Sequence, residues 1–255
     1  MRISLAQYAI AFGDPGQNLE RIRRYAETAA REQSQLLILP ELCLHGYHKS
    51  SILAGGQFHL PQLKDTLAGI AAQYKVGIIG TYVESVADAR YNTMAYIHND
   101  GTLLAAYRKK HLFQPMKEHL FFSPGSELCV ASTSPAKLGF AVCYDLRFPE
   151  QFRKMTAQGA EMFIIPAEWP QVRLDHWLTL LKARAIENLA WVVGCNCTGM
   201  IYKTLFGGNS VVISPWGDVI FQATEKEGVY TLDVNMETVR SIRREKPFLN
   251  DMEAD

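Results

Sequence analysis

Short apolar runs alternate with helical patterns along almost the whole chain, and this alternation most limits the folds that it can adopt. Residues 36–39 are wholly apolar, as are residues 162–165, which is typical of strands buried on both faces. Residues 18–33, beginning at the preferred N-cap residue Asn18, and residues 174–188 carry apolar side chains at helical spacing. Asn-Asp-Gly at residues 99–101 predicts a hairpin turn. We therefore expect an α/β protein whose mixed sheets are covered by helices.

Charge and composition exclude several classes of protein. The 26 Lys and Arg residues balance 26 Asp and Glu residues, which argues against a protein that binds nucleic acid through its phosphates. No segment approaches the ~18 uninterrupted apolar residues of a membrane span. The N-terminal segment lacks the features of a signal peptide, so we expect a cytoplasmic protein. The five cysteines contain no C-x-x-C pair, which argues against a disulfide framework and a zinc ribbon.

The chain shows no sign of division into separate domains. No linker, charge run or low-complexity tract interrupts it. We expect one domain over residues 1–255, with a C-terminal tail from about residue 248.

Two glutamates follow apolar strands in the same way. Residues 36–41 (Leu-Leu-Ile-Leu-Pro-Glu) resemble residues 163–168 (Phe-Ile-Ile-Pro-Ala-Glu), so Glu41 and Glu168 each come just after a predicted buried strand. Active sites gather at the ends of such strands, because the loops there open onto a crevice. Taken alone, however, a glutamate after a strand more often lies in solvent.

Cys143 lies between apolar residues 138–142 and a helix that Pro149 opens. A sharp turn between a strand and a helix exposes a side chain and aims the following backbone N–H groups at whatever bonds to it. A single cysteine in an apolar run is otherwise a core thiol. Lys109 belongs to a basic run at the end of a predicted strand. Taken alone, such a run indicates a strand end exposed to solvent.

Glu41, Lys109 and Cys143, in this order and each after a predicted strand, resemble the nitrilase (carbon–nitrogen hydrolase) superfamily. Residues 38–47 resemble its glutamate motif and residues 107–112 (Tyr-Arg-Lys-Lys-His-Leu) its lysine motif. The cysteine motif is matched by Val-Cys-Tyr-Asp-Leu-Arg-Phe-Pro, which begins at Val142. The resemblance extends from Ile3 to about Pro247.

The resemblance implies a four-layer αββα sandwich of two mixed sheets flanked by helices, no metal or organic cofactor, and a homodimer or higher homo-oligomer. It also implies hydrolysis of a non-peptide C–N bond through a cysteine thioester. The family uses a second glutamate on the loop between its lysine and cysteine motifs. Glu118 is the matching candidate and Glu127 the weaker one.

The residue types suit these roles. Glu41 would act as the general base for the thiol of Cys143, a contribution of roughly 100 to 10,000-fold in rate. Lys109 and the backbone N–H of Tyr144 would bind the oxyanion, where one donor contributes about 100 to 1,000-fold. Strand alternation sends Lys110 to the opposite face from Lys109, so Lys109 is the better candidate.

Residues 167–173 and the following His176 resemble the omega-amidase branch most, which releases ammonia from 2-oxoglutaramate or 2-oxosuccinamate. A substrate with a carboxylate remote from its amide needs a cation or a cluster of amide groups in the pocket. Arg147 and Arg173 are candidates, although Arg147 would otherwise pair with Asp145 and Arg173 would lie on the surface. The candidate substrate-binding residues are Tyr47, Phe113, Arg147, Trp169, Arg173 and His176.

Three other functions stay open from the sequence. The chain would be another amidase of the superfamily, acting on aliphatic or N-carbamoyl amides. It would alternatively be a catalytically inactive member that binds a partner or metabolite. A thiol protease with His176 or His45 as its base is the third, but it leaves Glu41 and Lys109 without a role.

Overall fold

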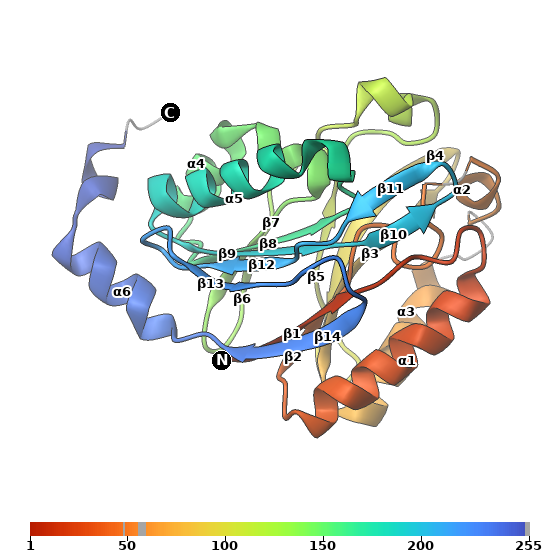
Figure 1. Ribbon diagram of the computed structural model, residues 1–255, viewed down its shortest axis with the longest axis horizontal. Coiled ribbons are helices and arrows are strands. Elements are labelled where there is room, and N and C mark those ends of the chain that lie inside the picture. Colours follow the sequence, from red (N-terminus) through yellow and green to blue (C-terminus); the bar gives the residue numbers. More distant parts are fainter. Residues whose placement is uncertain (48, 56–59, 253–255) are drawn as a thin grey trace.

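The computed structural model describes residues 1–47, 49–55 and 60–252. Two six-stranded sheets lie face to face, and helices cover their outer sides (Figure 1). Each sheet contains parallel and antiparallel pairs, so the expected four-layer αββα sandwich of mixed sheets is confirmed.

The first sheet has three parallel strands near its middle. In spatial order its strands are β14 (Gly228–Asp233), β1 (Arg2–Gln7), β2 (Leu36–Ile38), β3 (Gly77–Val86), β4 (Ala89–Ile97) and β5 (Leu103–Arg108). β1, β2 and β3 run parallel, and the other neighbours pair antiparallel. β4 and β5 form the hairpin predicted from the turn at residues 99–101.

The second sheet repeats this plan. Its order is β13 (Val219–Gln222), β12 (Val211–Ile213), β9 (Trp191–Asn196), β8 (Met162–Ala167), β7 (Lys137–Phe140) and β6 (Val130–Ser132). β7, β8 and β9 run parallel. A separate hairpin joins β10 (Thr198–Ile201) to β11 (Thr204–Gly207).

The longer helices pack on the outer faces of the sheets. α1 (Pro15–Arg31) and α3 (Leu60–Tyr74) cover the first sheet, and α4 (Pro149–Ala157) and α5 (Leu174–Asn188) cover the second. The remaining helices are α2 (Lys49–Gly55) and α6 (Met236–Glu245). No helix within the described residues is both long and apolar enough to cross a membrane.

Strand alternation explains why β2 is apolar at every position. Leu36 and Ile38 contribute to the core between the two sheets, whereas Leu37 and Leu39 pack against α1 and α3. In β8, Ile164 lies in the core between the sheets and its neighbours face α4 and α5. Both strands are fixed from two sides, so the loops that follow them start from rigid positions.

A short 3₁₀ turn lies at the start of the predicted C-terminal tail. Phe248–Asp251 form a 3₁₀ turn, and the Phe248 ring lies 6.5 Å from that of Trp216. Residues 253–255 of the predicted tail lie outside the described residues.

Candidate active site

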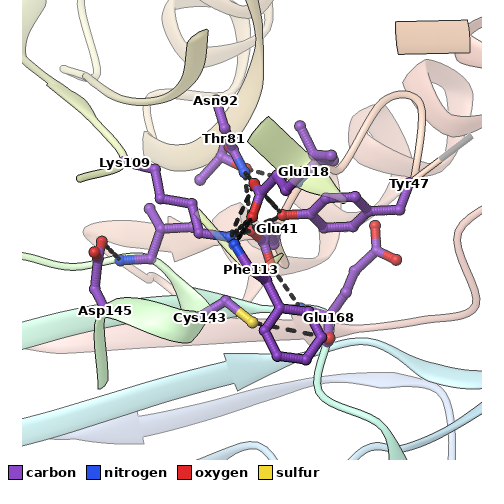
Figure 2. Close-up of polar contacts among 12 residues, drawn as sticks. Glu41, Tyr47, Thr81, Asn92, Lys109, Phe113, Glu118, Cys143, Asp145 and Glu168 are labelled. Carbon is purple, nitrogen blue, oxygen red and sulfur yellow. Dashed lines mark hydrogen bonds and ion pairs between the residues drawn. The ribbon is translucent and has the colours of Figure 1, made fainter. Parts of the chain in front are cut away.

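Glu41 is fully buried just beyond the end of β2, where it lies at the centre of a polar cluster (Figure 2). Its Oε1 atom accepts hydrogen bonds from Lys109 Nζ at 2.8 Å, Asn92 Nδ2 at 2.8 Å and Tyr47 Oη at 2.7 Å. Its Oε2 atom accepts one from the backbone N–H of Glu168 at 3.1 Å. The ends of β2 and β8 are thereby joined, so the two sheets meet at this carboxylate.

Lys109 follows β5 directly and its side chain is completely buried. Its Nζ lies 2.8 Å from Glu41 Oε1, 3.0 Å from both carboxylate oxygens of Glu118 and 2.8 Å from Tyr47 Oη. Burial opposes the positive charge, but the carboxylates of Glu118 and Glu41 outweigh it and raise the pKa of Lys109 above its ordinary value. The ammonium group is therefore a fixed positive charge at neutral pH.

Glu118 begins a short 3₁₀ turn, Glu118–Leu120, and is buried. Besides Lys109, it accepts hydrogen bonds from the backbone N–H of Phe113 at 2.6 Å and from Tyr47 Oη at 2.6 Å. The hydroxyl of Tyr47 has one proton, so it donates to Glu118 or to Glu41 but not to both at once. The alternative candidate Glu127 is exposed and lines a different cavity.

Cys143 stands on a strained turn after β7. It opens the 3₁₀ turn Cys143–Arg147 with φ of 45°, a left-handed conformation that is uncommon for residues other than glycine. Its Sγ atom lies 3.9 Å from the backbone oxygen of Glu168. Burial and then the negative charge of Glu41 raise the pKa of the thiol, and the opposing effect of Lys109 is smaller. The resting group is a thiol, so it needs a base before it can attack.

The backbone N–H of Tyr144 lies in the first turn after this strained residue. The first N–H groups of a helical turn have no partner within the turn. Tyr144 lines the same cavity as Lys109 and Cys143. This placement suits the predicted oxyanion site.

Asp145 connects the turn that contains Cys143 to residues 107–111 around Lys109 through hydrogen bonds. It is fully buried, and its carboxylate accepts hydrogen bonds from Tyr107 Oη at 2.7 Å, Val142 N at 2.9 Å and His111 N at 2.9 Å, with His111 Nδ1 at 2.8 Å. The sequence suggested Asp145 only as a partner for Arg147. Arg147 instead lies over the ring of Trp169, at 5.1 Å, and beside His176.

Lys109 and Cys143 open onto one cavity whose other wall is aromatic and cationic. Phe113 and Trp169 line it, with the guanidinium of Arg173 5.4 Å from the Phe113 ring. Both Arg147 and Arg173 are half-buried cavity residues. The cavity therefore has a charged, buried end at Lys109 and two cations nearer to solvent.

Most of the predicted substrate-binding residues line this cavity, but His176 does not. The five that do are Tyr47, Phe113, Arg147, Trp169 and Arg173. His176 is exposed on α5, and its Nδ1 lies 3.2 Å from an Nη of Arg147. His45 is buried elsewhere, and burial lowers its pKa to about 4. Neither histidine is among the residues that line the cavity with Cys143, so the thiol protease has no base there.

Two residues of the cluster were not predicted as site residues. Asn92, on β4, donates a hydrogen bond to Glu41, which lies 51 positions earlier in the chain. No local sequence pattern predicts a contact over such a separation. Glu168 lines the cavity, and the repeated strand-proline-glutamate pattern was the signal for it. Within the part of the chain that the structure describes, no group of three His, Cys, Asp or Glu side chains is arranged to hold a metal ion.

Comparisons with known proteins agree on one family. A family model described as carbon-nitrogen hydrolase matches residues 2–244. The chain is 36% identical over 254 residues to a 2-oxoglutaramate amidase of Bacillus subtilis, covering 99% of this chain and 98% of the relative. It is 29% identical over 258 residues to an omega-amidase of Xenopus tropicalis, covering 97% and 93%.

Two solved structures are similar over nearly their whole length. A CN-hydrolase superfamily protein from Xanthomonas campestris, with an arsenic adduct in its active site, has a TM-score of 0.94 at 29% identity and covers 100% of this chain and 98% of its own. A mutant amidase from Nesterenkonia sp. AN1, with acrylamide added to its active-site cysteine, has a TM-score of 0.86 at 30% identity, covering 96% and 97%.

Proposed function

The chain belongs to the carbon–nitrogen hydrolase (nitrilase) superfamily and is an amidase of that family, and from this premise we propose that it removes ammonia from the terminal amide of a small carboxylate-bearing amide. 2-Oxoglutaramate and 2-oxosuccinamate are the proposed substrates. One observation carries the proposal: Lys109 and Cys143 line one cavity together with two arginines, and Glu41 is hydrogen-bonded to Lys109 directly behind it.

The first half of the reaction forms a thioester. Glu41 takes the thiol proton of Cys143 as the sulfur attacks the amide carbon, and the carbonyl oxygen becomes an oxyanion. Lys109 Nζ and the N–H of Tyr144 stabilise this oxyanion, because both are fixed donors in a buried site. Glu41 then gives its proton to the amide nitrogen, the C–N bond breaks and ammonia leaves.

The second half hydrolyses the thioester. A water molecule gives a proton to Glu41 and attacks the thioester carbon, and the same donors hold the new oxyanion. Collapse of this intermediate releases the carboxylic acid, and the sulfur of Cys143 recovers a proton from Glu41. Glu118 accepts hydrogen bonds from Lys109 throughout and holds the ammonium group in place.

The substrate class follows from the cationic side of the cavity. A planar guanidinium binds a carboxylate through paired hydrogen bonds, and both Arg147 and Arg173 line the cavity. Their stacking on Trp169 and Phe113 restricts the two side chains before a substrate arrives. The relative in Bacillus subtilis that is described as a 2-oxoglutaramate amidase supports this choice.

The test combines three variants with a substrate panel. Cys143→Ala and Glu41→Gln should each abolish ammonia release, whereas His176→Ala should retain measurable activity. The panel contains 2-oxo-acid amides, simple aliphatic amides, nitriles and N-carbamoyl amino acids. Efficient turnover of nitriles or carbamoyl compounds alone would reject the substrate assignment. Full activity in Cys143→Ala would reject the chemistry.

We also infer from family membership that the chain works as a homodimer or a larger homo-oligomer and forms one domain. Sedimentation analysis of the purified protein tests the first statement, and a single cooperative unfolding transition would support the second. A monomer at micromolar concentration would contradict the first.

A further inference from the structure

Glu168 has a buried carboxyl group without a well-placed hydrogen-bond partner among the residues that the structure describes. The residue is 6% exposed, and neither carboxylate oxygen meets a well-aligned hydrogen-bond donor among the described residues. A buried polar group without a partner lowers stability, so such a group in a native protein calls for an explanation other than stability. Glu168 nevertheless lines the cavity with Cys143 and Lys109, and its side chain extends toward Tyr47 in Figure 2.

The surroundings of Glu168 favour an uncharged carboxyl group. Burial, and then the negative charge of Glu41, raise its pKa well above the ordinary value. Lys109 and the backbone of Tyr47 oppose this shift, and Glu118 adds to it. Among the described residues, the thiols of Cys43 and Cys197 also interact with its charge. A neutral carboxyl group carries one hydrogen-bond donor and one carbonyl acceptor.

The position of the leaving nitrogen follows from the hydrogen bonds of Glu41. Oε1 of Glu41 already accepts from Lys109, Asn92 and Tyr47, whereas the described residues give Oε2 one backbone donor, the N–H of Glu168. Oε2 is therefore the atom with room to pass a proton to the substrate. The amide nitrogen must come within hydrogen-bond reach of Oε2. The backbone N–H of Glu168 lies at this oxygen, and the residue lines the same cavity as Cys143.

We propose that Glu168 is a specificity-determining residue whose buried carboxyl group accepts a hydrogen bond from the leaving –NH2 group of a primary amide. The proposal rests on the proposed amidase function and adds a second contact for the nitrogen. Glu41 Oε2 transfers a proton to the leaving nitrogen. The carbonyl oxygen of Glu168 accepts a hydrogen bond from an N–H of that nitrogen, and this proton is not transferred. A substrate whose leaving group has no N–H gains nothing from Glu168.

The test compares Glu168→Leu and Glu168→Gln on two substrates with the same acyl group. One is the primary amide that the wild-type enzyme hydrolyses best, and the other is the 4-nitrophenyl ester of the same acid. Because kcat/KM reports steps up to release of the first product, it isolates formation of the thioester. Cys143→Ala supplies the background rate for the ester.

Glu168→Leu should lower kcat/KM for the amide by roughly 10 to 100-fold, because an N–H loses its acceptor in a buried site. The ester value should stay within about threefold, a change smaller than one lost hydrogen bond produces. Glu168→Gln is neutral at every pH and keeps a carbonyl acceptor. It should stay within about threefold of wild type on both substrates.

Three results would overturn the proposal. An equal loss on amide and ester in Glu168→Leu would assign the residue a structural role. A loss in Glu168→Gln as large as that in Glu168→Leu would mean that Glu168 works as an anion. Unchanged amide kcat/KM in Glu168→Leu would mean that the nitrogen does not contact it. A wild-type enzyme that releases no ammonia from any primary amide would instead refute the proposed function, and this proposal with it.

Discussion

Replacing Asp145 by asparagine should weaken both the fold and the catalytic turn, because this one side chain joins the lysine and cysteine segments. Its two carboxylate oxygens accept hydrogen bonds from different donors. Oδ1 faces the backbone N–H of His111 and His111 Nδ1, and Oδ2 faces Tyr107 Oη and the backbone N–H of Val142. An asparagine has one carbonyl oxygen and one NH2 group, so only one of these pairs keeps an acceptor.

The loss in free energy of unfolding follows from the donors that cannot adjust to an NH2 group. The hydroxyl of Tyr107 rotates and the ring of His111 changes tautomer, so both accommodate an NH2 group. The backbone N–H of His111 or of Val142 cannot, and one of them is left buried and unpaired in either orientation of the amide. Adding this penalty to the loss of charge from the remaining bonds gives about 2–4 kcal/mol of destabilisation. A chain of this size loses about 2–4 °C of melting temperature per kcal/mol.

The loss of activity has a separate origin. Val142 precedes Cys143, so a displaced Val142 moves the nucleophile. A displacement of about 1 Å in a catalytic group lowers kcat by about 100-fold. The assay is urea denaturation of Asp145→Asn beside kcat for the best amide substrate.

Asp88→Asn is the matched control, because Asp88 is exposed in the turn between β3 and β4. It should leave both the free energy of unfolding and kcat unchanged. If Asp145→Asn unfolds within about 0.5 kcal/mol of wild type, a change typical of surface substitutions, the reasoning about fixed donors is wrong.

Three further predictions follow from the cavity. Arg147→Gln and Arg173→Gln should raise KM for carboxylate-bearing amides but not for propionamide, and equal effects on both substrates would contradict the carboxylate anchor. Glu168→Gln should be more stable than wild type at pH 8, with the difference vanishing near pH 4 in melting-temperature measurements. The sign follows because the raised pKa of Glu168 makes the folded state bind a proton more tightly than the unfolded state, so stability falls as pH rises above the unfolded pKa. No difference at pH 8 would refute it. His176→Ala should change KM less than Arg147→Gln does, because His176 contacts the arginine from outside the cavity.

The fold was predictable where burial leaves a strong pattern. β2 and β8 are apolar at consecutive positions because sheet and helix layers cover them from opposite sides. The Asn-Asp-Gly turn predicted the β4–β5 hairpin because few other residues accept its backbone conformation. The edge strand β6 (Val130–Ser132) was missed, because it is short and only its middle residue is buried, which leaves neither an apolar run nor a period.

A tertiary contact overrode a local preference at Asn18. The residue type suits an N-cap, and the prediction that the helix starts there was wrong. α1 begins at Pro15, and the carboxylate of Asp14 caps it. The side chain of Asn18 is buried and pairs with the backbone of Ala11 and Leu44, which ties the loop after β1 to the loop after β2. Local propensity does not contain that information.

The site was predictable where a residue type follows a strand end. Glu41, Lys109 and Cys143 each have that position, and their meeting follows from the packing of the two sheets. Asn92 lies within a strand rather than at its end, so the sequence does not distinguish it, although its side chain donates a hydrogen bond to Glu41. Tyr47 was predicted as a wall of the pocket, but its hydroxyl also joins both glutamates and Lys109, which only the folded geometry reveals.

Intact-mass analysis of the rapidly quenched reaction tests most directly whether these groups act together on Cys143. After mixing with a slow amide substrate, the protein should gain the mass of the substrate less that of ammonia. Peptide mapping should locate this acyl group on Cys143 and leave Cys129, the other half-buried cysteine, unmodified. Turnover without an adduct in the early milliseconds to seconds, or an adduct on any other residue, would contradict the account.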